Sequence, residues 1–103
     1  MKRALVLVDL QNDFIPGGSL AVRDGDAVIP VANAVQKKTW DLIVAIATHG
    51  VFPGDALPRL SESGLFSHIA CTDSHVNARR LTSDKLLVKS VAPLFIPFLR
   101  RTQ

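Results

Sequence analysis

Two acids, Asp9 and Asp13, follow the first apolar run, in the stretch VLVDLQNDF from Val6 to Phe14. A carboxylate at the tip of a buried strand can orient or deprotonate a neighbouring nucleophile. Asp9 can equally cap a turn, and Asp13 can bond to loop amides. The residue types therefore leave a catalytic and a structural interpretation open for both acids.

Small polar residues that suit an anionic ligand follow the first two apolar runs. Gly17, Gly18 and Ser19 can present backbone N–H groups to a phosphate, or the glycines can simply let the chain turn with positive φ. The segment Thr48-His49-Gly50 follows the second run, where His49 can touch a ligand or serve as a hydrogen-bonded loop histidine. The pair Arg79-Arg80 can bind phosphate or remain a solvated surface pair.

Apolar runs alternate with helical patterns along the whole chain. Strands are expected at residues 4–8, 42–47, 68–72 and 85–89. Helices are expected at 26–39, capped by Asp26, at 55–63, capped by Asp55 and ended by Gly64, and at 91–101. Residues 73–83 are expected to form a loop. This order predicts a small three-layer, Rossmann-like α/β domain with about four parallel strands.

The predicted fold places the candidate residues at one edge of the sheet. Parallel strands are normally covered on both faces, and their ligand sites lie beyond the carboxyl ends of the strands. We therefore expect Asp9, Asp13 and the Gly17-Gly18-Ser19 turn on one side of a small-molecule site. Thr48, His49 and Gly50 are expected on the other side.

Composition excludes several classes of function. The chain has 103 residues, 48% of them hydrophobic, and a net charge of +3 with its bases scattered in pairs. Few aromatics and no basic stripe argue against nucleic-acid binding. The first apolar run is too short for a signal peptide or a membrane span, and the single cysteine suits a reducing compartment, so a cytoplasmic location is expected. So short a chain has few helices to cover a sheet, which predicts a homo-oligomer.

The first third of the chain, about residues 1–33, resembles a nicotinamidase of the isochorismatase-like hydrolase family. The motif VDLQNDF followed by GGSLAV carries this resemblance. It implies that Asp9 belongs to an Asp-Lys-Cys catalytic triad and that Phe14 borders the nicotinamide ring. The family's metal constellation is missing here, and Cys71 precedes Thr72-Asp73 instead of following such a pair. No metal and no cofactor are therefore expected.

The later chain, residues 41–99, resembles the carboxyl-terminal part of a ribose-phosphate pyrophosphokinase. The segments THGVFPGDA, GLFSHIACTDSH and LLVKSVAPLF carry this second resemblance. In that family an acidic loop binds ribose hydroxyls and loop amides cradle the 5-phosphate. Asp9, Asp13 and Gly17-Gly18-Ser19 reproduce part of that pattern, while the ATP-binding half has no counterpart.

Two functions follow from these resemblances. The first is a catalytically incomplete nicotinamidase-like fragment, in which nicotinamide hydrolysis would serve NAD salvage. The alternative is a phosphoribosyltransferase-like domain that binds ribose 5-phosphate, or an inactive fusion product. One α/β domain is expected in either case, with a nicotinamidase-like segment at 1–40 and a pyrophosphokinase-like segment at 41–103. Whether the chain is an enzyme stays open.

Overall fold

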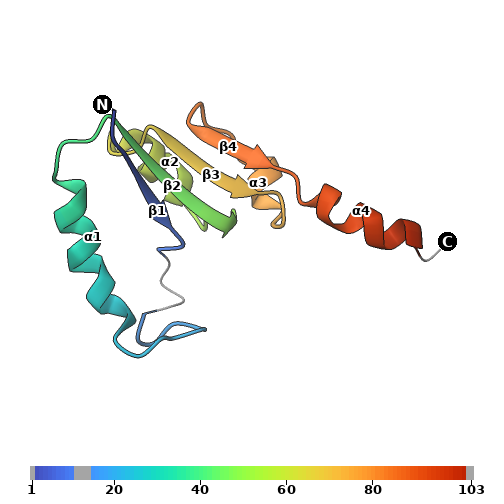
Figure 1. Cartoon of the computed structure of the whole chain (residues 1–103), viewed down its shortest axis with the longest axis horizontal. Helices are drawn as coiled ribbons and strands as arrows, with labels where there is room; N and C mark the ends of the chain where they lie inside the picture. Colours follow the sequence, from blue (N-terminus) through green and yellow to red (C-terminus); the bar gives the residue numbers. More distant parts are fainter. Residues whose placement is uncertain (1, 11–14, 102–103) are drawn as a thin grey trace.

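One parallel β-sheet organises the protein, as a computed structural model that describes residues 2–10 and 15–101 shows (Figure 1). Its strands are β1 (Ala4–Val8), β2 (Leu42–His49), β3 (His68–Thr72) and β4 (Leu86–Lys89). They pair side by side in the order β1-β2-β3-β4, all parallel. The α/β class and the four-stranded parallel sheet predicted from the sequence are therefore confirmed.

Helices occupy the crossovers and the end of the described chain. They are the 3-10 turn η2 (Gly25–Ala27), α1 (Val28–Gln36), α2 (Ala56–Glu62), α3 (Asn77–Arg80) and α4 (Ala92–Arg101). The predicted cap at Asp26 is wrong, because Asp26 lies inside the 3-10 turn. Asp55 stands at the N-cap position of α2, as predicted, but its side chain makes no capping hydrogen bond. Gly64 follows α2 with φ of 71°, as expected of a glycine that ends a helix. The expected loop after β3 contains the short helix α3.

Trp40 and Asp41 fix the entry to β2. The Trp40 indole donates to the Val35 carbonyl at 2.8 Å, and the Arg3 guanidinium lies 5.3 Å from the Trp40 ring centre. The Asp41 carboxylate accepts a hydrogen bond from the Arg3 backbone N–H at 2.6 Å, and the Asp41 backbone N–H donates to the Arg3 carbonyl. Because β1 and β2 thus begin together, with Ala4 opposite Leu42, their carboxyl ends also emerge together.

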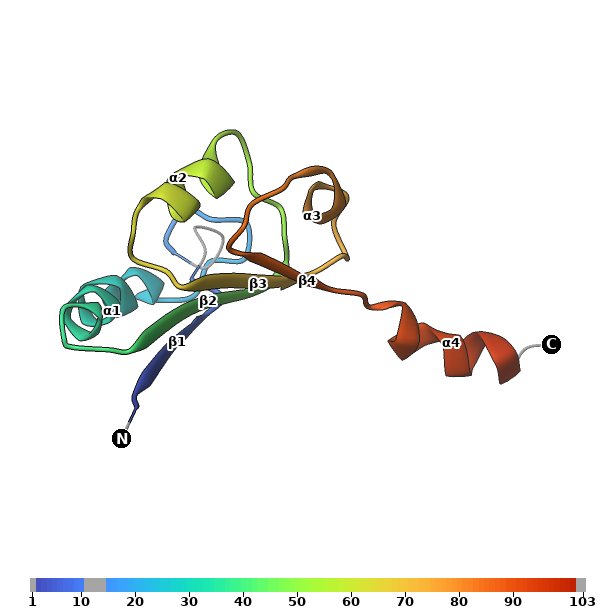
Figure 2. The same ribbon diagram turned by 90° about the horizontal axis from the view of Figure 1, so that it is seen from above.

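The buried core is small and centred on β3. Leu57 of α2, Ala78 of α3, Ile69 and Cys71 are 5% exposed or less. Alternate side chains of a strand point to opposite faces, so Ile69 and Cys71 share the face on which α2 and α3 lie (Figure 2). That face is the one that the chain itself covers.

The opposite face of the sheet carries no helix among the described residues, as the edge-on view shows (Figure 2). Val6 and Val8 of β1 are 50% and 58% exposed, and Ile46 of β2 is 38% exposed. The expectation that these strands are covered on both faces is therefore wrong for the part of the chain that the structure describes. The crossover helices α2 and α3 cover one face, while α4 leaves the sheet after β4 (Figure 1).

Candidate functional site

The carboxyl ends of three adjacent strands meet at one edge of the sheet. Asp9 follows β1, Thr48 and His49 end β2, and Thr72 ends β3, with Ser74 two residues beyond it. Hydrogen bonds join these residues across the strand ends. We call Asp9, Thr48, His49, Thr72 and Ser74 the polar edge.

Asp9 is held tightly at this edge. Its backbone has φ of 54°, a left-handed conformation that is uncommon for an aspartate. Its N–H donates to the Ile46 carbonyl at 2.9 Å, and its carboxylate Oδ1 accepts the Thr48 N–H at 3.3 Å. The carboxylate is therefore positioned by β2 and supplies negative charge and hydrogen-bond acceptors at the strand tip.

Hydroxyl and imidazole groups continue the polar edge toward β3. The Thr72 hydroxyl donates to the Thr48 carbonyl at 2.5 Å. The Ser74 Oγ lies 2.6 Å from His49 Nδ1 and 2.9 Å from Thr72 Oγ1. His49 and Ser74 are both exposed, so they can offer donors to a ligand in solvent. The sequence reasoning missed Thr72 and Ser74, although their position directly after the third strand is the signal that marks them.

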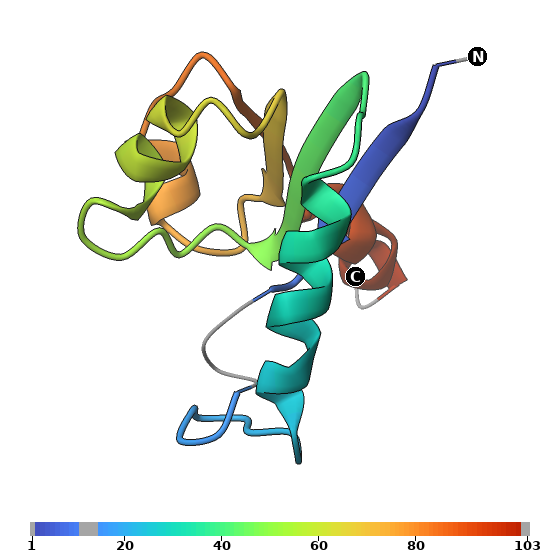
Figure 3. The same cartoon turned by 90° about the vertical axis from the view of Figure 1, so that its left-hand side faces the viewer.

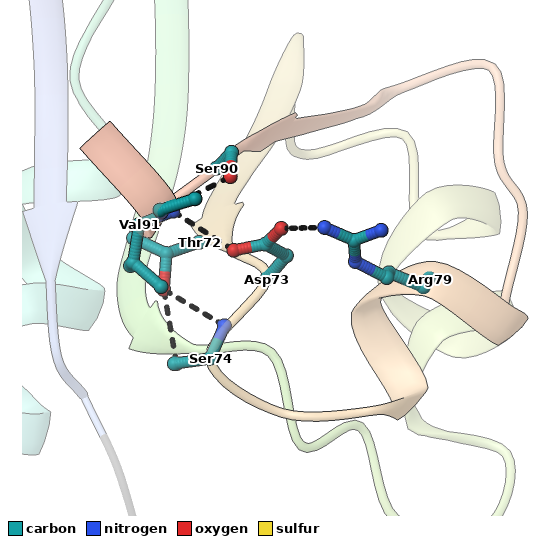
Figure 4. A network of polar contacts seen from close by, with 7 residues as sticks. Thr72, Asp73, Ser74, Arg79, Ser90 and Val91 are labelled. Atoms are coloured by element: carbon teal, nitrogen blue, oxygen red, sulfur yellow. Dashed lines mark hydrogen bonds and ion pairs between the residues drawn. The ribbon is translucent and has the colours of Figure 1, made fainter. Parts of the chain in front are cut away.

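Asp73 points away from the polar edge and has a structural role (Figure 4). Its carboxylate accepts the Val91 N–H at 2.9 Å and is paired with the Arg79 guanidinium. The Val91 N–H and then Arg79 hold the pKa of Asp73 below its usual value. His75 Nδ1 accepts the Asn77 N–H at 3.1 Å. Asp73 and His75 are thus both engaged in holding the chain around α3.

Gly50 and Cys71 are packing residues. Gly50 is buried, and a Cβ atom there would lie 2.6 Å from Cys71 Sγ and 3.0 Å from Ala78 Cβ. Only glycine allows the end of β2 to lie this close to β3 and α3. Burial raises the pKa of the Cys71 thiol, which favours the unreactive protonated form.

The glycine turn lies apart from the polar edge. Gly17 has φ of 88°, and the Gly18 N–H donates to the Ile15 carbonyl at 2.9 Å. Figures 1 and 3 both place this turn near the start of α1, away from the end of β2. Nothing lies within 4 Å of a Cβ built on Gly17, so its backbone conformation is what calls for glycine. Ser19 is exposed in the same segment.

Two candidate site residues lie outside the part of the chain that the structure describes, and no metal-binding cluster lies inside it. Asp13 and Phe14 fall outside the described residues. Within residues 2–10 and 15–101, no three His, Cys, Asp or Glu side chains gather closely enough to hold a metal ion. No helix in these ranges has the length and apolar character needed to cross a membrane.

Comparison with known proteins finds partial similarity to two kinds of enzyme. The chain is 68% identical over 31 residues to a nicotinamidase of Escherichia coli (strain K12), which covers 30% of this chain and 15% of that protein. It is 42% identical over 86 residues to a ribose-phosphate pyrophosphokinase of Caldanaerobacter subterraneus, which covers 84% of this chain and 25% of that protein. It is 31% identical over 81 residues to ribose-phosphate pyrophosphokinase 1 of Saccharomyces cerevisiae, a match that covers 77% of this chain and 19% of that protein.

These matches confirm both resemblances found in the sequence and extend the second. The chain spans a quarter or less of the length of each of these relatives. Residues 41–103 are fewer than the 86 residues matched, so the pyrophosphokinase similarity reaches back across residues 37–41. No model of a protein family matches the chain, and no solved structure matches it.

Proposed function

We propose that this chain is a sugar-phosphate-binding domain of the ribose-phosphate pyrophosphokinase kind, which binds ribose 5-phosphate at the polar edge. The observation that carries the proposal is the hydrogen-bonded row from Asp9 through Thr48 to Thr72, Ser74 and His49. The greater extent of similarity to the pyrophosphokinases supports it. The proposal concerns binding of the sugar phosphate alone.

The polar edge contains groups for both parts of such a ligand. Asp9 provides a carboxylate, which accepts hydrogen bonds from ribose hydroxyls. Ser74 provides a hydroxyl and His49 provides an imidazole N–H, and each of these groups can donate to an anionic oxygen. Ser74 is exposed and its Oγ lies 2.6 Å from His49 Nδ1, so a phosphate bound at one of these side chains lies beside the other.

The two sequence segments would then work as one domain. β1 belongs to residues 1–40 and pairs along its length with β2 from residues 41–103. The carboxylate of Asp9 comes from the first segment, while Thr48, His49, Thr72 and Ser74 come from the second. This division supports a binding site that needs both segments.

A titration followed by amide chemical shifts tests the proposal. Ribose 5-phosphate at millimolar concentration should shift the amides of Asp9, Thr48 and Ser74, and the affinity should fall as salt rises. Substitution His49→Ala should weaken binding about tenfold or more, the cost of losing a hydrogen bond to a charged group. His68→Ala is the matched control, because His68 is exposed at the opposite end of β3. No response to ribose 5-phosphate would overturn the proposal.

A nicotinamidase-like function is the second candidate, favoured by the 68% identity over 31 residues. Its expected catalytic residue is Asp9. The buried Cys71, whose raised pKa keeps the thiol protonated, is poorly suited to be its nucleophile. In the same titration, nicotinamide shifts around Phe14 without a response to ribose 5-phosphate would favour this hydrolase ancestry over sugar-phosphate binding.

A further inference from the structure

One face of the sheet exposes apolar side chains from three of its strands. In-register parallel partners point to the same side, and this side differs from the one covered by α2 and α3. Five of its large apolar side chains are more than a third exposed, and we call these five the open face: Val6 (50%), Val8 (58%), Leu42 (36%), Ile46 (38%) and Leu87 (53%). Parallel sheets are normally covered on both faces, so this surface needs a partner.

Helix α4 exposes a second apolar surface. Leu94, Phe95 and Phe98 are 67%, 58% and 65% exposed, and their spacing places them along one side of the helix. We call these three residues the α4 stripe. An isolated helix of ten residues is marginal in water, and Pro97 in its interior removes a backbone hydrogen bond. Packing of the α4 stripe against another surface is therefore what would keep this helix folded.

The accessible surface of the chain is larger than that of a compact monomer of the same mass. The accessible surface is 7801 Å², whereas a compact monomer of 11.2 kDa exposes about 5700 Å². The excess of about 2100 Å² exceeds the roughly 800 Å² that each partner buries in a standard interface. The radius of gyration is 15.9 Å, against about 13 Å for a compact domain of this length.

The junction between β4 and α4 directs the helix away from its own sheet. Lys89 ends β4 and α4 begins at Ala92, so only Ser90 and Val91 connect them. The Val91 N–H donates to the Asp73 carboxylate at 2.9 Å, and Asp73 donates its own N–H to the Lys89 carbonyl at 3.1 Å (Figure 4). The Asp73 side chain is only 7% exposed and is paired with Arg79. So short and anchored a connection holds α4 pointing outward (Figure 1).

We propose that a second copy of this chain covers the open face, with the α4 of each protomer lying on the sheet of the other. The dimensions fit. Ten helical residues span about 15 Å and five strand residues about 16 Å. Each protomer donates one helix and accepts one, so the contact closes on itself about a two-fold axis. In the dimer, the α4 stripe of each protomer thereby covers the open face of its partner.

Light scattering after size-exclusion chromatography tests this dimer. The wild-type chain should be a dimer at micromolar concentration. Phe95→Glu on α4 and Val8→Glu on the open face should each raise the dissociation constant by about 30-fold or more, as expected of buried apolar anchors. Leu65→Glu is the matched control, because Leu65 is 54% exposed and lies in the connection between α2 and β3. That variant should remain dimeric.

A mixing experiment separates helix exchange from any other association. A chain with Phe95→Glu and a chain with Val8→Lys should each be largely monomeric alone. Mixed together, they should form heterodimers, because the introduced charges attract each other where α4 of one chain meets β1 of the other. A wild-type monomer with a radius of gyration near 13 Å would overturn the proposal, since α4 would then fold onto its own sheet. A dimer that neither variant weakens would overturn it as well.

Discussion

The substitution Gly50→Ala should destabilise the fold by crowding the side chains that pack against Gly50, Cys71 above all. The new Cβ would lie 2.6 Å from Cys71 Sγ, about 1 Å inside a normal contact, and 3.0 Å from Ala78 Cβ and the Phe52 ring. Cys71 and Ala78 are 5% and 3% exposed, so neither can retreat into solvent. Overpacking of this kind costs about 1–3 kcal/mol, and we expect the upper part of that range.

Cys71→Ala should partly restore the stability of Gly50→Ala. Alone, Cys71→Ala removes one small buried group and should cost about 1 kcal/mol. Combined with Gly50→Ala it removes the closest overlap, so the double variant should be more stable than Gly50→Ala by itself. The double variant should therefore lose less stability than the sum of the losses in the two single variants.

Urea denaturation and thermal melting measure these effects. A loss of about 2 kcal/mol or more lowers the melting temperature of a domain this size by roughly 10 °C. Gly64→Ala is the control, because Gly64 has φ of 71° and open space around it. Its cost comes from the backbone alone, about 1–2 kcal/mol, and Cys71→Ala should not relieve it. Unchanged stability in Gly50→Ala, or a double variant less stable than either single one, would refute the reasoning.

Three further predictions concern Asp73, the nicotinamide reaction and the thiol. The pKa of Asp73 is lowered by the Val91 N–H and Arg79, so its stabilisation is present above the unfolded value of 3.8 and is lost as pH falls through the lower folded value. The stability difference between wild type and Asp73→Asn should therefore shrink below about pH 4 in acid titrations, and a constant difference would contradict this. Purified protein should not release ammonia from nicotinamide at an enzymatic rate; release lost in both Asp9→Ala and Cys71→Ala would show otherwise. Because burial raises the pKa of Cys71, a maleimide should react with it far more slowly in native than in urea-unfolded protein at neutral pH, and equal rates would count against this.

Local pattern was enough to predict the sheet. The apolar runs that became β1 and β3 have the bounds read from the sequence, because a short apolar run with β-branched or small residues is a local property. The alternation of strand and helix then required parallel pairing. The convergence of Asp9 with Thr48 follows from that topology, since parallel neighbours end at the same edge, and a hydrogen bond of 3.3 Å joins them.

Side-chain roles at that edge depended on long-range contacts. Gly50 looks like a ligand-binding glycine in the sequence, and only the approach of Cys71 and Ala78 shows that it is a packing residue. Asp73 follows the third strand, as a ligand-binding acid would, yet Arg79 and Val91 engage its carboxylate. The helix α3 that supplies Arg79 has four residues, too few to leave a periodic signal.

The coverage of the sheet was decided at the tertiary level alone. Hydrophobicity shows that Val8 and Phe95 should be buried, but it does not say against what. Whether α4 covers its own sheet depends on the direction that the chain takes between the end of β4 and the start of α4. The Asp73 carboxylate anchors the Val91 N–H in that connection, through a bond between residues 18 positions apart that no local pattern records.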